Sequence, residues 1–128
     1  MDIRALNGAT LAYIGDGVMS MWVREYLLYS GNVKPHLMQR KSEAWVSAKA
    51  QARFVKALKE IDFFSEEEWN MVLRGRNANI HTKAKNADIQ TYKYATGLEA
   101  LIGWLYLNKQ ETRLQELWEQ IKELGEQE

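Results

Sequence analysis

The stretch LNGATLAYIGDGVMSMWV, residues 6–23, has the composition of a buried helix but carries a carboxylate at its centre. Its apolar residues recur every three or four positions, which predicts a first helix from about Leu6 to Ser30 with a break near Gly15. Asp16 lies between Gly15 and Gly17, although each glycine weakens a helix by about 1 kcal/mol relative to alanine. An unpaired buried carboxylate costs several kcal/mol, so Asp16 needs a partner. The glycines are explained if another backbone or a substrate comes close.

Four further segments have helical periodicity, and none of the chain has the short β-branched runs typical of strands. They are a second region from Pro35 to about Glu60, a third helix from the Ser65 and Glu68 capping box to Gly75–Asn79, a fourth from about Asp88 to Asn108, and a fifth from about Glu111 to Leu124 that stops at Gly125. The sequence therefore predicts an all-α protein.

Composition sets broad limits on the class of protein. The 128 residues fit a single domain, residues 1–128, and 46% hydrophobic with 27% charged residues is an ordinary globular balance. There is no cysteine, and the net charge is zero. No apolar run is long enough to cross a bilayer, and no leader-like segment precedes the first helix. We therefore expect a cytoplasmic protein with no membrane contact.

A second unusual carboxylate, Glu99, is the only charge in YATGLEALIGWLYL, residues 94–107. Neither it nor Asp16 has a lysine or arginine three or four residues away to form a salt bridge within the helix. The simplest joint explanation is that both bind one divalent cation, because Mg²⁺ prefers oxygen ligands and often takes only one or two carboxylates. The alternative is that both are partly exposed or are paired with arginines from other helices.

Several of these segments resemble a known family. YIGDGVM, residues 13–19, and EALIGWLYL, residues 99–107, resemble the two signature segments of ribonuclease III nuclease domains. The likeness is closer to Mini-III ribonucleases, the compact bacterial branch without a double-stranded-RNA-binding domain, in LNGATLAYIGDGV, KPHLMQRKS, VSAKAQA, RGRNA and KNADIQTYKYAT. This resemblance covers nearly the whole chain.

The resemblance implies a fold, an activity and a set of site residues. Asp16 and Glu99 match the family's metal-binding catalytic acids, whereas Ala12 and Thr96 stand where the wider ribonuclease III pattern has two more acids. It further implies an all-helical homodimer that uses Mg²⁺ to cleave double-stranded RNA, leaving 5′ phosphates. The implied substrate is the precursor of large-subunit ribosomal RNA, with a ribosomal protein as a candidate assisting partner.

A surface for RNA is expected where basic groups stand beside short polar side chains, because A-form RNA is contacted mainly at phosphates and 2′-hydroxyls. The candidates lie in and after the RGRNA segment: Arg74, Arg76, Asn77, Thr82, Lys83, Lys85, Asn86, Gln90 and Thr91. Two other functions stay open. One is a catalytically silent helical RNA-binding module, and the other is an all-α metal-dependent nucleotide hydrolase.

Overall fold

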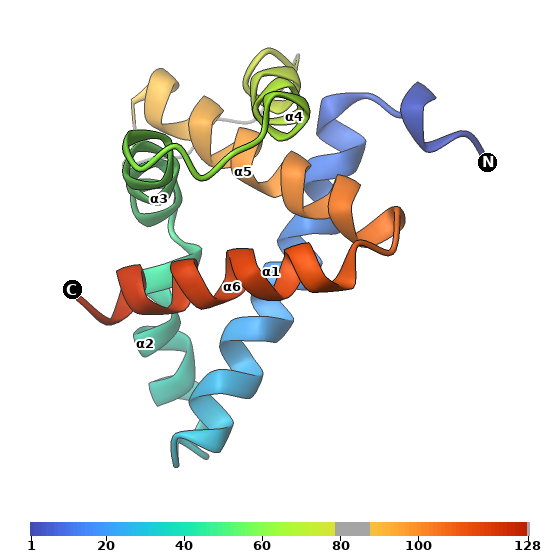
Figure 1. Cartoon of the computed structure of the whole chain (residues 1–128). Helices are drawn as coiled ribbons and strands as arrows, with labels where there is room; N and C mark the ends of the chain where they lie inside the picture. The colour runs from blue at the N-terminus through green and yellow to red at the C-terminus, as the bar shows by residue number, and fades with distance from the viewer. Residues whose placement is uncertain (79–87, 128) are drawn as a thin grey trace.

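The computed structural model describes residues 1–78 and 88–127, and all regular structure in these two ranges is helical (Figure 1). A short 3₁₀ helix, η1 (Ile3–Ala5), precedes α1 (Gly8–Tyr29), α2 (Pro35–Val46), α3 (Ala48–Glu60), α4 (Glu66–Arg76), α5 (Ile89–Leu107) and α6 (Glu111–Glu126). The prediction of an all-α protein is confirmed. None of the described helices has both the length and the apolar composition needed to span a bilayer.

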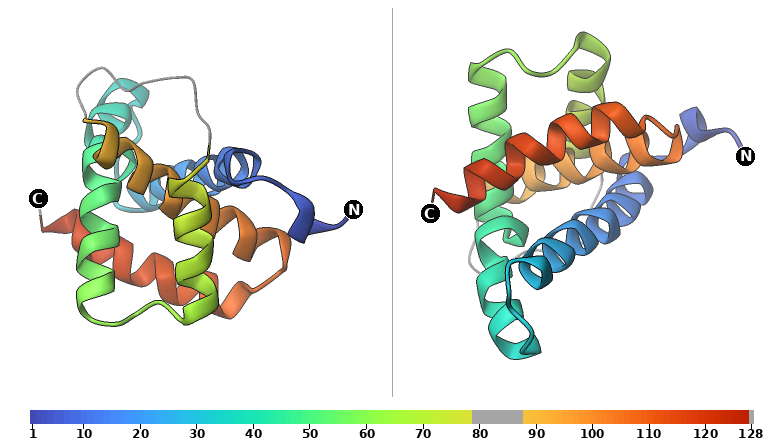
Figure 2. Two further views of the ribbon diagram at one scale, coloured as in Figure 1. Left: turned by 90° about the horizontal axis from the view of Figure 1, so that it is seen from above. Right: turned by 60° about the horizontal axis from the view of Figure 1, so that its bottom comes forward.

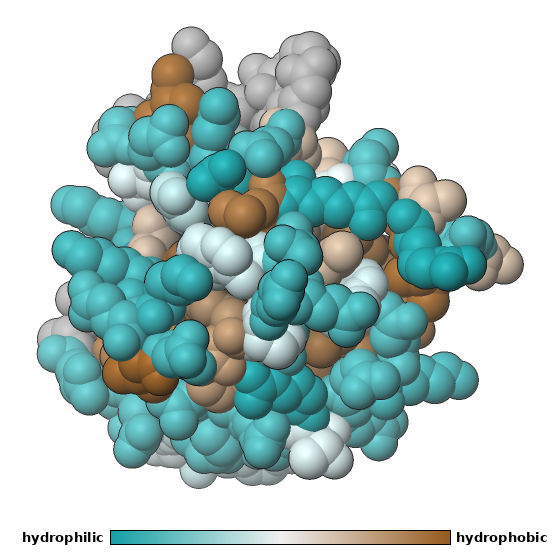
Figure 3. Space-filling view, turned by 45° about the horizontal axis from the view of Figure 1, so that its top comes forward, coloured by the Kyte–Doolittle hydropathy of each residue, from teal (hydrophilic) through white to brown (hydrophobic). Residues whose placement is uncertain are grey.

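Helix α5 runs through the middle of the molecule and packs against α1, α3, α4 and α6 (Figure 2). Because it is covered on most sides, its buried residues do not form a single stripe, and even its small residues Ala95, Thr96 and Gly97 are buried. Hydrophilic side chains dominate the face seen in Figure 3, where hydrophobic residues reach the surface only in small, separate areas. The core therefore lies around α5.

Helices α1 and α5 cross with their backbones in direct contact. A Cβ atom on Gly15 would overlap the carbonyl oxygen of Glu99, and a Cβ atom on Gly103 would overlap that of Leu11. The two glycines therefore permit an approach that no larger residue allows. The break expected near Gly15 is wrong: α1 continues unbroken from Gly8 to Tyr29, because Gly15 serves packing between helices.

The region from Pro35 to Glu60, expected as one helical region, is divided into α2 and α3 at Ser47. This residue has extended backbone angles (φ −67°, ψ 151°), and its side-chain oxygen accepts a hydrogen bond from the amide of Ala50 at 3.1 Å. Ser47 is therefore the N-cap of α3. After this division α3 packs mainly against α5.

The C-terminal helix also differs from the expectation. Gly125 does not end α6, which continues to Glu126. Instead, Gly125 lies against the indole of Trp45, where a Cβ atom would overlap the ring, and the indole nitrogen donates to the carbonyl of Lys122 at 3.3 Å. This glycine is thus a packing residue between α2 and α6.

Candidate active site

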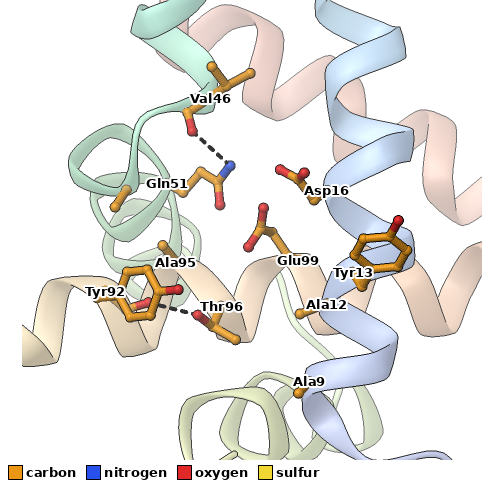
Figure 4. A pocket seen from close by; sticks show the side chains of 11 residues that line it. Ala9, Ala12, Tyr13, Asp16, Val46, Gln51, Tyr92, Ala95, Thr96 and Glu99 are labelled. Atoms are coloured by element: carbon orange, nitrogen blue, oxygen red, sulfur yellow. Dashed lines mark hydrogen bonds between the residues drawn. The ribbon is translucent and has the colours of Figure 1, made fainter. Parts of the chain in front are cut away.

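A cavity of about 430 Å³ opens between α1, α3 and α5, and both carboxylates singled out from the sequence line it. Asp16 projects from α1 and Glu99 from α5, and their carboxylates point toward one another (Figure 4). Asp16 lies on the exposed side, whereas Glu99 is partly buried behind it. The structure therefore brings together two acids that are 83 residues apart in the sequence.

The contact between α1 and α5 explains why the two acids meet. Gly15 is in direct contact with the carbonyl of Glu99. Asp16, the next residue of α1, therefore lies close to Glu99. The glycine before the aspartate is thus part of the site, because it sets the distance between the two helices. Gly17, in contrast, faces open space: a Cβ atom there would meet nothing within 4 Å beyond its own stretch of helix, so this residue takes no part in the crossing.

Burial raises the pKa of Glu99 to about 9, and the hydrogen bond and negative charge of Asp16 act in the same direction. The amide of Gln51 has the opposite effect on this pKa. No lysine or arginine within residues 1–78 and 88–127 forms an ion pair with either acid. Of the alternatives left open, pairing with an arginine thus has no support in these ranges, while Asp16 is indeed exposed.

Two carboxylates are all that the described residues supply to this cavity. Ala12 and Thr96, which occupy the positions of the additional acids, both line it. The hydroxyl of Thr96 donates to the carbonyl of Tyr92 at 3.0 Å, within its own helix. In the described ranges no three His, Cys, Asp or Glu residues are grouped closely enough to hold a metal ion. The pair Asp16 and Glu99 nevertheless fits a divalent cation, since both carboxyl groups face one cavity and the described residues supply no basic partner to either.

Gln51 is a member of this site that the sequence reasoning missed. It is 2% exposed, it lines the cavity from α3, and its Oε1 atom has no hydrogen-bond partner among the described residues. A signal was present in the sequence: Gln51 shares the buried face of α3 with Phe54, Val55 and Leu58. A glutamine in this i, i+3, i+4, i+7 pattern occupies a position that is normally apolar.

The residues predicted to bind RNA are not gathered in the cavity. Arg74 donates to the carbonyls of Arg4 at 2.9 Å and Leu6 at 2.5 Å, and so holds the N-terminal segment against α4. Arg76 donates to Asn77 Oδ1 at 3.0 Å and to the hydroxyl of Tyr94 at 3.2 Å. These two arginines therefore already have partners within the fold.

The other predicted RNA-binding residues fall into two groups. Gln90 and Thr91 lie in the first turn of α5 and line a separate hollow with Lys56 and Lys59 of α3. Four predicted residues lie outside the described ranges: Thr82, Lys83, Lys85 and Asn86. The assignment of this surface stays a prediction.

The sequence is similar to known ribonucleases over the segments that form this site. The sequence model of the ribonuclease III domain matches residues 9–110, which include both carboxylates. Mini-ribonuclease 3 of Enterococcus faecalis is 47% identical over 127 residues, which cover 98% of this chain and 96% of that protein. Mini-ribonuclease 3 of Staphylococcus aureus is 46% identical over 119 residues, covering 93% and 89%.

A solved structure has the same fold. The crystal structure of a protein from Fusobacterium nucleatum superposes with a TM-score of 0.79 at 34% identity, covering 91% of this chain and 93% of that one. The helical fold with its facing acids thus has the form of a ribonuclease III domain. The chain belongs to the ribonuclease III family and, within it, groups with the proteins named Mini-ribonuclease 3.

Proposed function

We propose that this protein is a magnesium-dependent endoribonuclease that cleaves double-stranded RNA. The observation that carries the proposal is the meeting of Asp16 and Glu99 in one open cavity of a ribonuclease III fold. The relatives named as ribonucleases, similar over nearly their whole length, support the choice of RNA as substrate.

Asp16 and Glu99 are the residues that would hold the cation. Glu99 is positioned deep in the cavity by α5, and Asp16 stands at its exposed side, where a phosphate group can approach. Bound Mg²⁺ supplies polarisation of a phosphodiester and a bound water of lowered pKa. The chain then needs no nucleophile of its own, and we propose products with a 5′ phosphate and a 3′ hydroxyl.

The outer face of α1 supports a homodimer. Met21 is 54% exposed, and Tyr106 of α5, 53% exposed, lines the same hollow. Two hollows lie on this face, and Val18, Trp22 and Tyr106 line both of them. A two-fold pairing through this face would provide two equivalent sites, one for each strand of a duplex.

We propose that RNA lies across the surface carrying Arg76, Asn77, Gln90 and Thr91, beside the cavity lined by Tyr92. The predicted contacts at Arg74, Thr82, Lys83, Lys85 and Asn86 belong to the same proposal. The proposed substrate is a precursor of large-subunit ribosomal RNA in the cytoplasm, with a ribosomal protein as assisting partner.

Incubation of the purified protein with duplex RNA tests this function. With Mg²⁺ we expect cleavage of duplex RNA and not of duplex DNA, and no cleavage in EDTA. Asp16→Asn and Glu99→Gln should each lower the rate by more than about 100-fold, since loss of a metal ligand costs more than the roughly 10- to 100-fold typical for residues that only hydrogen-bond to a ligand. Glu123→Gln, which changes an exposed carboxylate on α6, is the matched control and should be fully active.

Other results would favour the alternatives. Turnover of nucleoside triphosphates with intact RNA indicates a nucleotide hydrolase. Binding of duplex RNA without cleavage at any Mg²⁺ concentration indicates a catalytically silent binding module. Unchanged cleavage by both carboxylate variants, with unchanged circular dichroism, contradicts the assignment of the site.

A further inference from the structure

One buried side-chain polar atom in the described part of the chain has no hydrogen-bond partner, and it lies in the candidate active site. This atom is Oε1 of Gln51, in a side chain that is only 2% exposed. Buried side-chain acceptors are nearly always satisfied, and an unsatisfied one lowers stability. An unsatisfied buried acceptor in a native fold calls for an explanation, and one explanation is a bound ion.

The orientation of the amide is set by the end of α2. Its Nε2 atom donates to the carbonyl of Val46 at 3.3 Å, and Val46 is the last residue of that helix (Figure 4). The opposite orientation would place Oε1 against the Val46 carbonyl, so that two acceptors would face each other. Val46 therefore directs Oε1 away from itself and toward the cavity.

Two carboxyl groups and one amide oxygen consequently face one cavity from three helices. They are Asp16 from α1, Gln51 from α3 and Glu99 from α5, and Figure 4 shows them directed toward a common space. Amide oxygens are ligands for hard divalent cations alongside carboxylates. A neutral third oxygen also suits the charge balance, because two carboxylates already match a doubly charged ion.

We propose that Gln51 is the third oxygen donor of the cation site and binds the hydrated divalent ion through Oε1. This inference rests on the proposed function, to which it adds a residue beyond the two carboxylates. It gives the junction of α2 and α3 a role in the site: Ser47 begins α3, Val46 fixes the amide, and Gln51 presents its oxygen.

Two substitutions separate cation binding from a purely structural role. Gln51→Met keeps the length of the side chain but removes the oxygen, whereas Gln51→Glu keeps an oxygen. Both remove the N–H group that donates to Val46, since an ionised glutamate has no donor. A structural role predicts the same result for both variants, and a cation-binding role predicts different results.

The measurement is Mn²⁺ binding to the full-length protein without RNA, followed by the electron paramagnetic resonance signal of free Mn²⁺. We expect Gln51→Met to raise the dissociation constant by tenfold or more, because loss of an oxygen donor should cost at least as much as loss of a residue that only hydrogen-bonds to a ligand. We expect Gln51→Glu to bind as tightly as the parent protein or more tightly. Gln39→Met and Gln39→Glu, at an exposed position of α2, control for the change of side chain and of charge.

The outcomes distinguish this inference from the proposed function. Parent-like Mn²⁺ binding by Gln51→Met overturns the role of Gln51 alone, and so does an equal loss in Gln51→Met and Gln51→Glu. Circular dichroism establishes that both variants are folded; if Gln51→Met is unfolded, Gln51→Glu must still bind at least as tightly as the parent. RNA cleavage by the parent protein in EDTA would contradict the proposed function itself.

Discussion

Asp16 and Glu99 lie 83 residues apart in the sequence, and the fold brings them together through the contact of two helix backbones. The decisive residue is Gly15, because a side chain there would push α1 away from the carbonyl of Glu99. The helix loses about 1 kcal/mol of intrinsic stability to this glycine, which the close packing offsets. The residue that makes the site is therefore one that carries no functional group.

Alanine at Gly15 tests this explanation. The overlap is with a backbone carbonyl, which cannot rotate away as a side chain can, so we expect Gly15→Ala to lower the free energy of unfolding by about 2 kcal/mol. Gly17→Ala adds the same methyl group two residues later in open space, and should raise stability by up to about 1 kcal/mol. Urea unfolding at equal protein concentrations measures both. Equal effects at the two positions would contradict the account.

At the scale of single residues, the sequence predicted the acids but not their third neighbour. Asp16 and Glu99 were recognisable because a lone charge in an apolar run demands a partner. Gln51 could not be recognised from composition, because α3 is rich in lysine and arginine and one more polar residue is not unusual there. Only its place on the buried face, with Phe54 and Leu58, distinguishes it.

At the scale of helices, α4 and α6 are joined by a charged pair at the start of α4. The Nε of Arg113 donates to Glu68 Oε2 at 2.6 Å and its Nη2 to Oε1 at 2.8 Å and to the carbonyl of Phe63 at 2.6 Å. Glu68 also completes the predicted capping box with Ser65. The carboxylate of Glu68 therefore both caps the start of α4 and connects α4 to α6 through Arg113.

This link predicts how stability depends on pH. Burial would raise the pKa of Glu68, but hydrogen bonds from Arg113 and Ser65 outweigh it and hold the pKa below its ordinary value of 4.5. A lowered pKa in the folded state adds stability above pH 4.5, which is lost as pH falls through the folded-state pKa. In the parent protein the free energy of unfolding should therefore fall between pH 5 and about pH 2. Glu68→Gln should make this fall smaller, as measured by urea unfolding at each pH.

Glu67→Gln is the matched control, because Glu67 occupies the same helical turn but is exposed. Its pH profile should follow that of the parent protein. An unchanged profile for Glu68→Gln would mean that the pair with Arg113 makes no net contribution.

Helix types were predictable from local patterns, whereas helix ends depended on contacts distant in sequence. The capping box at Ser65 is contained within four residues, and it was found. The role of Gly125 depends on Trp45, 80 residues away, so a glycine that resembles a helix stop is in fact a packing position. Ser47 fits an N-cap, but good helix formers on both sides concealed the division at that residue.

At the scale of the whole molecule, the exposed apolar residues of α1 lie on the side of that helix away from the core. The proposed homodimer would cover them. Met21→Glu places a charge in that face and should give a monomeric mass by sedimentation at micromolar concentration, with unchanged circular dichroism. Ile61→Glu, at another exposed apolar residue with 62% exposure, should leave the mass unchanged. A monomeric parent protein would contradict the proposed dimer.

The central claim is that Asp16 and Glu99 share one divalent cation, and anomalous diffraction from crystals grown with Mn²⁺ measures this most directly. We predict an anomalous peak in the cavity between α1 and α5, with an oxygen of each carboxylate about 2 Å away. A Mn²⁺ site elsewhere, or a fully occupied cavity peak that touches neither acid, would contradict the account.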